Sequence, residues 1–401
     1  MSNPSLKLPE PPAELAELSR ELCTRIVNAI DADGPMPFQR YMAMALYEPG
    51  LGYYVNGLHK FGAAGDFVTA PEHGRLFAMA LARQLDPLGS ELGPDWTVLE
   101  LGPGSGALAR DVLLQQQNPP AKYLLLEPSA PLRDVQRETL SVLPDDLLRR
   151  VEWVAAPPTE RFDGAVIANE VIDALPVARF RIGETGIEEA RVTVEAGRLA
   201  WDCAPAEGRV LRAVDQAFSD LPHPHRVGYA SEVCVDLPEW LNAVTAALNR
   251  GIALIIDYGY PRREYYHPDR NDGTLVCHYR HRAHFDPFAW PGLTDLSAFV
   301  DFTAVAEAAQ QCGLEIAGFT NQAGFVLGSG IGDVLGQVAD AGGDESDDQR
   351  QQLMLSGEFK RLVLPGEMGE KFKVMALVRD LDGSLDWTPE AFALSDQLDR
   401  L

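Results

Sequence analysis

The sequence has few cysteines and no paired cysteine motif. Five cysteines lie singly along 401 residues, and no two of them have C-x-x-C spacing. Isolated cysteines are typical of chains whose thiols stay reduced, as in the cytosol, rather than of disulfide frameworks. Long apolar runs are also missing, which predicts no membrane span and no membrane partner. The acidic N-terminal stretch resembles neither a secretory nor a transit peptide, so we predict a cytoplasmic protein.

Positive charge is scarce as well. The chain has 34 lysines and arginines against 59 aspartates and glutamates, a formal net charge of −25. This balance argues against a nucleic-acid partner or an anionic membrane surface, because both require a basic face. An acidic chain suits a cationic acceptor instead, such as a basic side chain on another protein.

Two catalytic classes lack their motifs. No G-x-S-x-G is present, which argues against a nucleophilic-serine hydrolase. His278, His281 and His284 lie three residues apart, but no further ligands with zinc spacing accompany them. We therefore predict no metal site, and we interpret these histidines and the neighbouring arginines as a basic patch that is either structural or faces a substrate.

The most informative feature present is the glycine-rich run from Val98 to Ala107. An apolar segment containing Glu100 leads into Gly102, Gly104 and Gly106, and a helix-like stretch follows. A strand that turns through glycines into a helix N-terminus lets a ligand approach bare backbone. In open α/β sheets this turn marks a nucleotide-type cofactor site.

Two cofactors fit this turn. Gly102, Gly104 and Ala107 satisfy the dinucleotide pattern G-x-G-x-x-G/A, which predicts an NAD-dependent oxidoreductase. Glu100 favours S-adenosylmethionine as the cofactor. A carboxylate repels the pyrophosphate of a dinucleotide but attracts the sulfonium and ammonium groups of S-adenosylmethionine. E-x-G-x-G-x-G also matches the first motif of class I methyltransferases. A further acid, Glu127, ends the next predicted strand, where it can accept two hydrogen bonds from a ribose diol.

The periodicity predicts an α/β fold with a doubly wound sheet. Together with the match to the first motif, we expect a Rossmann-like class I methyltransferase sheet with helices on both faces, an N-terminal helical cap and inserted α+β segments. We expect a cap over 1–95, a core over 96–380 and a tail over 381–401. Insertions are expected at about 177–250, with a hairpin, and at 260–300, a loop region. The acidic stretch 340–350 predicts a mobile loop before a short helix. The expected sheet strands are 97–101, 122–127, 150–154, 164–169, 252–257, 314–319 and 373–378.

Polar residues follow the fourth of these strands. Asn169, Glu170 and Asp173 lie at its carboxyl end, the end that faces the ligand crevice in such sheets. A cationic acceptor such as arginine is a poor nucleophile, and carboxylates can hold it and help its extra proton leave. We predict Glu170 and Asp173 as catalytic residues and Asn169 as a positioning residue at the cofactor. The alternative is that Asn169 and Asp173 only cap the next helix.

Three more residues are candidates for contact with the substrate. Asp257 and Tyr258 end the strand 252–257 in the same manner, and Glu232 is a further acid that can face the crevice.

Several segments together carry a family resemblance across residues 35 to 380. They are 65–72, 100–106, 169–176, 256–259, 273–275, 279–282 and 300–303. The chain resembles the MidA-like methyltransferases, the family that contains the mitochondrial complex I assembly factor that methylates arginine. The resemblance departs at Val171 and Ile172, where the family more often has aromatic residues.

The resemblance implies a class I fold, S-adenosyl-L-methionine as cofactor and N-methylation of a protein arginine, with a respiratory-complex subunit among the possible partners. It also implies that the segment around Phe67, Thr69 and Pro71 covers the cofactor. The alternatives are a small-molecule methyltransferase and an assembly factor that binds the cofactor without turnover.

Overall fold

The computed structural model describes residues 8–57, 74–333 and 345–401. The chain forms two compact units, each built from three separate stretches. Unit 1 comprises Met1–Phe67, Asp173–Leu237 and Arg262–Asp301, and unit 2 comprises Val68–Ile172, Pro238–Pro261 and Phe302–Leu401. Each unit is described by itself below. Among the helices that the structure describes, none is long and apolar enough to cross a membrane.

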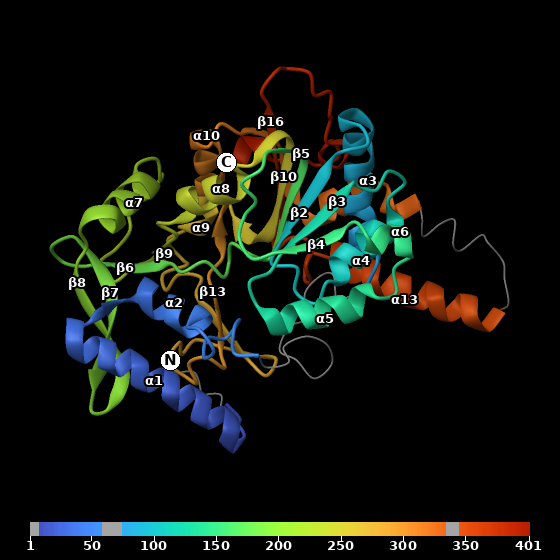
Figure 1. Ribbon diagram of the computed structural model, residues 1–401. Coiled ribbons are helices and arrows are strands. Elements are labelled where there is room, and N and C mark those ends of the chain that lie inside the picture. The colour runs from blue at the N-terminus through green and yellow to red at the C-terminus, as the bar shows by residue number, and fades with distance from the viewer. Residues whose placement is uncertain (1–7, 58–73, 334–344) are drawn as a thin grey trace. The chain divides into compact units, whose positions relative to one another are not determined.

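Unit 2 is built on the predicted sheet. Its strands run in the order β15-β16-β10-β5-β2-β3-β4, and all seven expected segments are strands. The strands from β16 to β4 are labelled in Figure 1. β4, β3, β2, β5 and β10 are parallel, whereas β16 is antiparallel to both β10 and β15. The strands are β2 (Thr97–Leu101), β3 (Lys122–Leu126), β4 (Val151–Val154), β5 (Phe162–Asn169), β10 (Leu248–Tyr260), β15 (Glu315–Asn321) and β16 (Phe372–Asp380).

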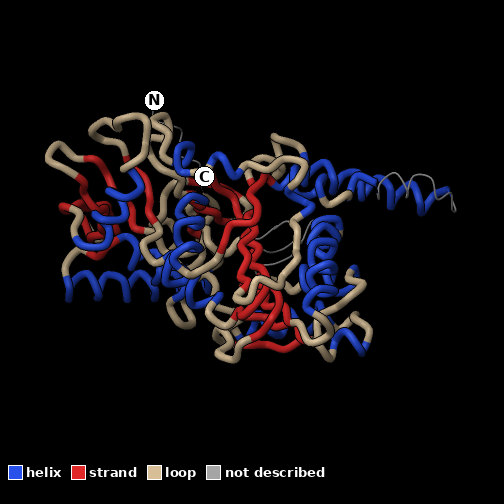
Figure 2. The backbone as a smooth tube through the Cα atoms, turned by 90° about the horizontal axis from the view of Figure 1, so that it is seen from above, coloured by secondary structure: helices blue, strands red, loops and turns tan. Residues whose placement is uncertain are grey.

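Helices cover the sheet of unit 2 on both sides, as the view from above shows (Figure 2). Alternate strand residues such as Val98, Ile167 and Leu254 are fully buried in one core cluster together with residues of α3, α4 and α11. This one-sided alternation is what period-2 side-chain placement gives. The helices are α3 (Leu76–Leu92), α4 (Ala107–Gln115), α5 (Ala130–Leu140), α6 (Asp145–Leu148), α8 (Leu237–Thr245), α10 (Phe302–Gln311), α11 (Gln322–Gly328) and α13 (Glu345–Val363).

Unit 1 contains two small antiparallel sheets. In one the order is β1-β7-β6-β9, with β8 paired to β7, and in the other it is β12-β11-β13. The predicted hairpin region 179–201 is confirmed as strands β6, β7 and β8. The helices of unit 1 are α1 (Ala13–Asp33), α2 (Phe38–Tyr47), α7 (Gly208–Phe218) and α9 (Arg262–Tyr265). Its strands are β1 (Met36–Pro37), β6 (Ala178–Ile182), β7 (Ile187–Glu195), β8 (Arg198–Pro205), β9 (Ala230–Val233), β11 (Val276–Tyr279), β12 (Arg282–His284), β13 (Asp295–Ser297) and β14 (Val300–Asp301).

The units divide the chain differently from the predicted boundaries. The expected cap over 1–95 is split, because α3 packs into the core of unit 2. The expected tail over 381–401 also belongs to that unit, since Trp387 and Phe392 are buried in the same core. Two short 3-10 helices, Glu390–Phe392 and Leu398–Arg400, form part of this segment.

Two local expectations are wrong. Residues 260–300 are not only loop, because β11, β12 and β13 form a sheet there, with a tight turn at Arg280 (φ 48°) and His281 (φ 59°). The expected mobile loop over 340–350 lies partly outside the described residues. Its last part, from residue 345, is already helical, and α13 is 19 residues long instead of short.

Candidate functional site

The glycine-rich loop after β2 has the conformation that its sequence requires. Gly102, Gly104 and Gly106 have φ angles of 57°, 55° and 84°, the left-handed region that residues with a Cβ avoid. A Cβ at Gly102 would lie 3.3 Å from Cγ2 of Val171, so that side of the loop has no spare room. Helix α4 starts directly after the loop at Ala107. The predicted strand–glycine–helix turn is confirmed.

Glu100 is buried in β2 beside the next strand. It is 2 % exposed, and the hydroxyl of Tyr123 donates a hydrogen bond to its Oε2 over 2.7 Å. Burial raises the pKa of Glu100 to about 7, although the Tyr123 bond lowers it. The carboxyl group therefore titrates near neutrality, and a cation nearby would favour its charged form.

Glu127 is held by a network that the sequence did not predict. Its Oε1 accepts the backbone N–H of Ser129 over 2.8 Å and its Oε2 accepts Nε2 of Gln136 over 3.2 Å. The same Nε2 donates to the carbonyl of Gly104 over 2.9 Å, and Oε1 of Gln136 accepts the indole N–H of Trp153 over 2.9 Å. Gln136 thereby ties the glycine loop, the end of β3 and β4 together. No local pattern marks it, because its contacts are made across separate elements.

The end of β5 is strained. Glu170 has φ 54°, a left-handed conformation that is uncommon for a residue with a side chain. Its backbone N–H donates a hydrogen bond to the carbonyl oxygen of Ile256 over 2.8 Å. Oδ1 of Asn169 is buried and has no hydrogen-bond partner among the described residues. Backbone strain and an unsatisfied buried oxygen each cost free energy, and features of this kind cluster at active sites and ligand-binding sites.

Asp257 holds this strained turn in place. Its side chain is fully buried, with Oδ2 accepting the N–H of Ile172 over 3.0 Å and Oδ1 accepting the N–H of Tyr258 over 2.9 Å. The ring of Tyr258 lies edge-on to Phe372, with centroids 5.2 Å apart. Asp257 thus stabilises the local backbone through its two carboxylate oxygens. Direct substrate contact by Asp257 and Tyr258 stays a prediction.

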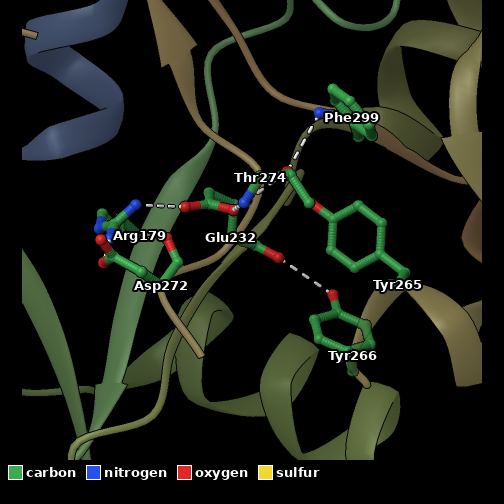
Figure 3. A network of polar contacts seen from close by, with 7 residues as sticks. All are labelled: Arg179, Glu232, Tyr265, Tyr266, Asp272, Thr274 and Phe299. Carbon is green, nitrogen blue, oxygen red and sulfur yellow. Dashed lines mark hydrogen bonds and ion pairs between the residues drawn. The ribbon is translucent and has the colours of Figure 1, made fainter. Parts of the chain in front are cut away.

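Glu232 lies in the interior of unit 1 (Figure 3). It is fully buried and accepts Nη1 of Arg179 over 2.5 Å and the backbone N–H of Thr274 over 2.8 Å. Its own carbonyl accepts the hydroxyl of Tyr266 over 3.0 Å. Burial raises the pKa of Glu232, and Arg179 and Thr274 counteract this. Both carboxylate oxygens are thus engaged by the protein itself, which is the arrangement of a structural ion pair, and contact with a substrate stays a prediction.

The remaining predicted residues fall in different places. Asp173 is 4 % exposed and lies in unit 1, three residues along the chain from Glu170. Phe67, Thr69 and Pro71, which the resemblance assigns to the cofactor, lie outside the described residues.

Comparisons with known proteins identify the family. A family model described as "Putative S-adenosyl-L-methionine-dependent methyltransferase" matches residues 76–320. A crystal structure of a COG1565 superfamily protein from Burkholderia thailandensis, bound to S-adenosyl-homocysteine, is similar over 98 % of this chain and 100 % of that one. It shares 37 % identity with a TM-score of 0.89. The chain belongs to this family of S-adenosyl-L-methionine-dependent methyltransferases.

Curated relatives cover nearly the whole chain. A Drosophila melanogaster protein named protein arginine methyltransferase NDUFAF7 homolog, mitochondrial, is 29 % identical over 92 % of this chain and 89 % of its own. The human protein arginine methyltransferase NDUFAF7, mitochondrial, is 27 % identical over 88 % of this chain and 82 % of its own length. The predicted family, the Rossmann-like class I fold and the cofactor S-adenosyl-L-methionine are confirmed, and the NAD-dependent alternative is wrong.

Proposed function

We propose that this enzyme transfers a methyl group from S-adenosyl-L-methionine to an arginine side chain of a partner protein. The observation that carries the proposal is the strained Glu170, fixed at the carboxyl end of β5 where Val171 packs against the glycine loop. A carboxylate so placed can hold a guanidinium and take up its proton. The names of the relatives, which are protein arginine methyltransferases, support the same acceptor.

The cofactor supplies a methyl group on a positively charged sulfur. We assign its binding to the bare backbone of Gly102, Gly104 and Gly106 and to Glu127, whose carboxylate suits a ribose diol. Asn169 fits a cofactor-binding role, because its buried Oδ1 has no partner within the described part of the chain. Glu100 contributes negative charge beneath the loop. Phe67, Thr69 and Pro71 are assigned by resemblance only.

On the acceptor side the protein has to align the nucleophile and receive a proton. Glu170 is our candidate for both tasks, because Asp257 fixes the turn that carries it. Asp173, three residues later, is the second candidate. A respiratory-complex subunit as partner stays a prediction, and so does a cytoplasmic location, since the curated relatives are named mitochondrial.

The test uses Glu170→Gln, with Glu184→Gln at an exposed turn as the matched control. Purified enzyme, a methyl-labelled cofactor and protein extract from cells lacking this chain are combined, and methylarginine is measured by mass spectrometry. We expect wild type and control to label specific arginines, and Glu170→Gln to be about 100-fold slower or worse. Labelled metabolites with no labelled protein would contradict the proposal. Unchanged turnover in Glu170→Gln would remove that residue from the mechanism.

A further inference from the structure

Gln136 is a fully buried polar residue beside the glycine-rich loop of unit 2. It lies in α5, whose buried residues are Gln136 and Leu140, and it is 0 % exposed. Burying an amide group costs free energy unless its polar atoms find partners. An apolar side chain would fill the same place without that requirement. The amide at this position therefore calls for an explanation beyond packing.

Trp153 fixes the orientation of the Gln136 amide. The indole N–H donates to Oε1 of Gln136 over 2.9 Å. Because an indole can only donate, the amide oxygen has to face it, and the amide nitrogen has to point the other way. There its two N–H groups meet two acceptors, the carbonyl of Gly104 at 2.9 Å and Oε2 of Glu127 at 3.2 Å. A flipped amide would lose all three hydrogen bonds.

The carboxylate of Glu127 is thereby held at both oxygens. The backbone N–H of Ser129 donates to Oε1 over 2.8 Å, and Gln136 donates to Oε2. The terminal torsion of a glutamate side chain is soft, so two donors on different oxygens are needed to set the plane of the carboxylate. Carboxylate oxygens accept more than one hydrogen bond each, and a carboxylate of fixed plane suits a vicinal diol.

Gln136 also packs against the loop itself. A Cβ at Gly106 would lie 3.4 Å from Cα, Cβ and Cγ of Gln136, which is close van der Waals contact. Together with the hydrogen bond to the carbonyl of Gly104, this contact relates the backbone of the loop to the end of β3. One side chain thus sets the position of Glu127 relative to the loop.

We propose that Gln136 is a positioning residue: Trp153 holds its amide in one orientation, and the amide holds the Glu127 carboxylate in the plane that accepts both hydroxyls of a ribose. The proposal rests on the proposed function, which assigns Glu127 to the ribose diol. Gln136 acts through Glu127 and not on the cofactor directly. Its consequence is selectivity for an adenosyl ligand with an intact 2′,3′-diol.

The experiment measures binding of S-adenosyl-homocysteine and of its 2′-deoxy and 3′-deoxy derivatives to the full-length protein by calorimetry. We expect wild type to bind S-adenosyl-homocysteine at least about tenfold more tightly than either derivative, because each lacks a hydroxyl that donates to a carboxylate. Gln136→Met removes both donors but keeps the length of the side chain. It should weaken S-adenosyl-homocysteine about tenfold and the deoxy derivatives less than about threefold, so that most of the discrimination is lost.

A second variant and a matched control accompany Gln136→Met. Trp153→Phe keeps a ring but frees the amide to flip, so it should reduce the same discrimination to a smaller extent. The control is Gln322→Met, because Gln322 is also fully buried in unit 2 and its Nε2 donates to the carbonyl of Leu362 over 3.2 Å. This control should keep the affinities of wild type for all three ligands. Thermal unfolding verifies that each variant is folded.

The outcomes separate a positioning role from a structural one. If Gln136→Met weakens all three ligands by the same factor, or binds S-adenosyl-homocysteine as wild type does, the proposal is overturned. If wild type itself binds the three ligands equally, the assignment of Glu127 to the ribose is wrong and the proposal falls with it. Loss of discrimination in Gln136→Met supports the positioning role whether or not methylarginine forms in extracts, because the binding measurement does not involve the acceptor.

Discussion

The two units hold their charged residues by different means. In unit 2 the candidate site is held mainly through the backbone. Three glycines in left-handed conformations shape the loop, and Asp257 accepts hydrogen bonds from backbone N–H groups around the strained Glu170. In unit 1 side chains hold one another, as in the buried pair of Glu232 and Arg179. A site held by the backbone can be recognised from a short local sequence motif. A side-chain network cannot, because it joins residues that are distant in the sequence.

This contrast has an energetic side. A loop fixed by glycines leaves its surroundings open to a ligand, at the cost of some conformational entropy. A buried ion pair stabilises the fold only while both partners are present, because either one alone is an uncompensated charge. Unit 1 should therefore be the more sensitive to single charge changes, and unit 2 the more sensitive to changes in backbone shape.

The largest effect is expected for Glu232→Gln. It leaves the guanidinium of Arg179 largely buried without its main partner, which should lower the free energy of unfolding by about 3–5 kcal/mol. Urea unfolding followed by circular dichroism measures the loss. Asp272→Asn is the control, because Asp272 also contacts Arg179 but its side chain is 86 % exposed, and its removal should cost less than about 1 kcal/mol. Equal losses for the two variants would erase the contrast between the units.

An intermediate effect is expected for Glu100→Gln. The folded protein binds the Glu100 proton more tightly than the unfolded chain does, so stability falls as pH rises from about 4.5 to about 7. Removing this group should stabilise the cofactor-free protein above pH 7, by up to about 3 kcal/mol. Thermal unfolding between pH 5 and 8 measures the change. A variant no more stable than wild type at pH 8 would contradict a desolvated Glu100.

The smallest change in stability is expected for Gly104→Ala. An alanine at φ 55° should cost about 1–2 kcal/mol. Gly383 has φ 67° with nothing within 4 Å of a Cβ, so Gly383→Ala should cost about the same. Only Gly104→Ala should also weaken the binding of S-adenosyl-homocysteine, by at least tenfold in Kd as measured by calorimetry. If both variants bind S-adenosyl-homocysteine normally, the backbone of the glycine loop does not bind the cofactor.

The sequence was sufficient for most of unit 2. Its parallel strands are short apolar runs that end in glycines or acids, so both the sheet and the ends that carry Glu127 and Asn169 were predictable. Gln136 was not, because its three partners lie on the glycine loop, at the end of β3 and in β4. Such a junction exists only once the elements have packed.

Unit 1 was harder for the same reason. The pairing of Met36 with Val192 joins residues far apart in the chain, and no local pattern announces it. The strands around His278 and Asp295 are three or four residues long, too short for a convincing alternation. Glu232 gained its structural partners, Arg179 and Thr274, only when the fold brought them beside it.

The order of strands in the central sheet has a consequence for biosynthesis. β16, the last strand in the chain, lies between β15 and β10 and pairs with both. Until residues 372–380 have left the ribosome, β15 has no neighbour through which to join the sheet. The sheet is thus closed by late insertion of one strand, and a nascent chain stalled before that point would present two open strand edges, which are ready targets for chaperones or for aggregation.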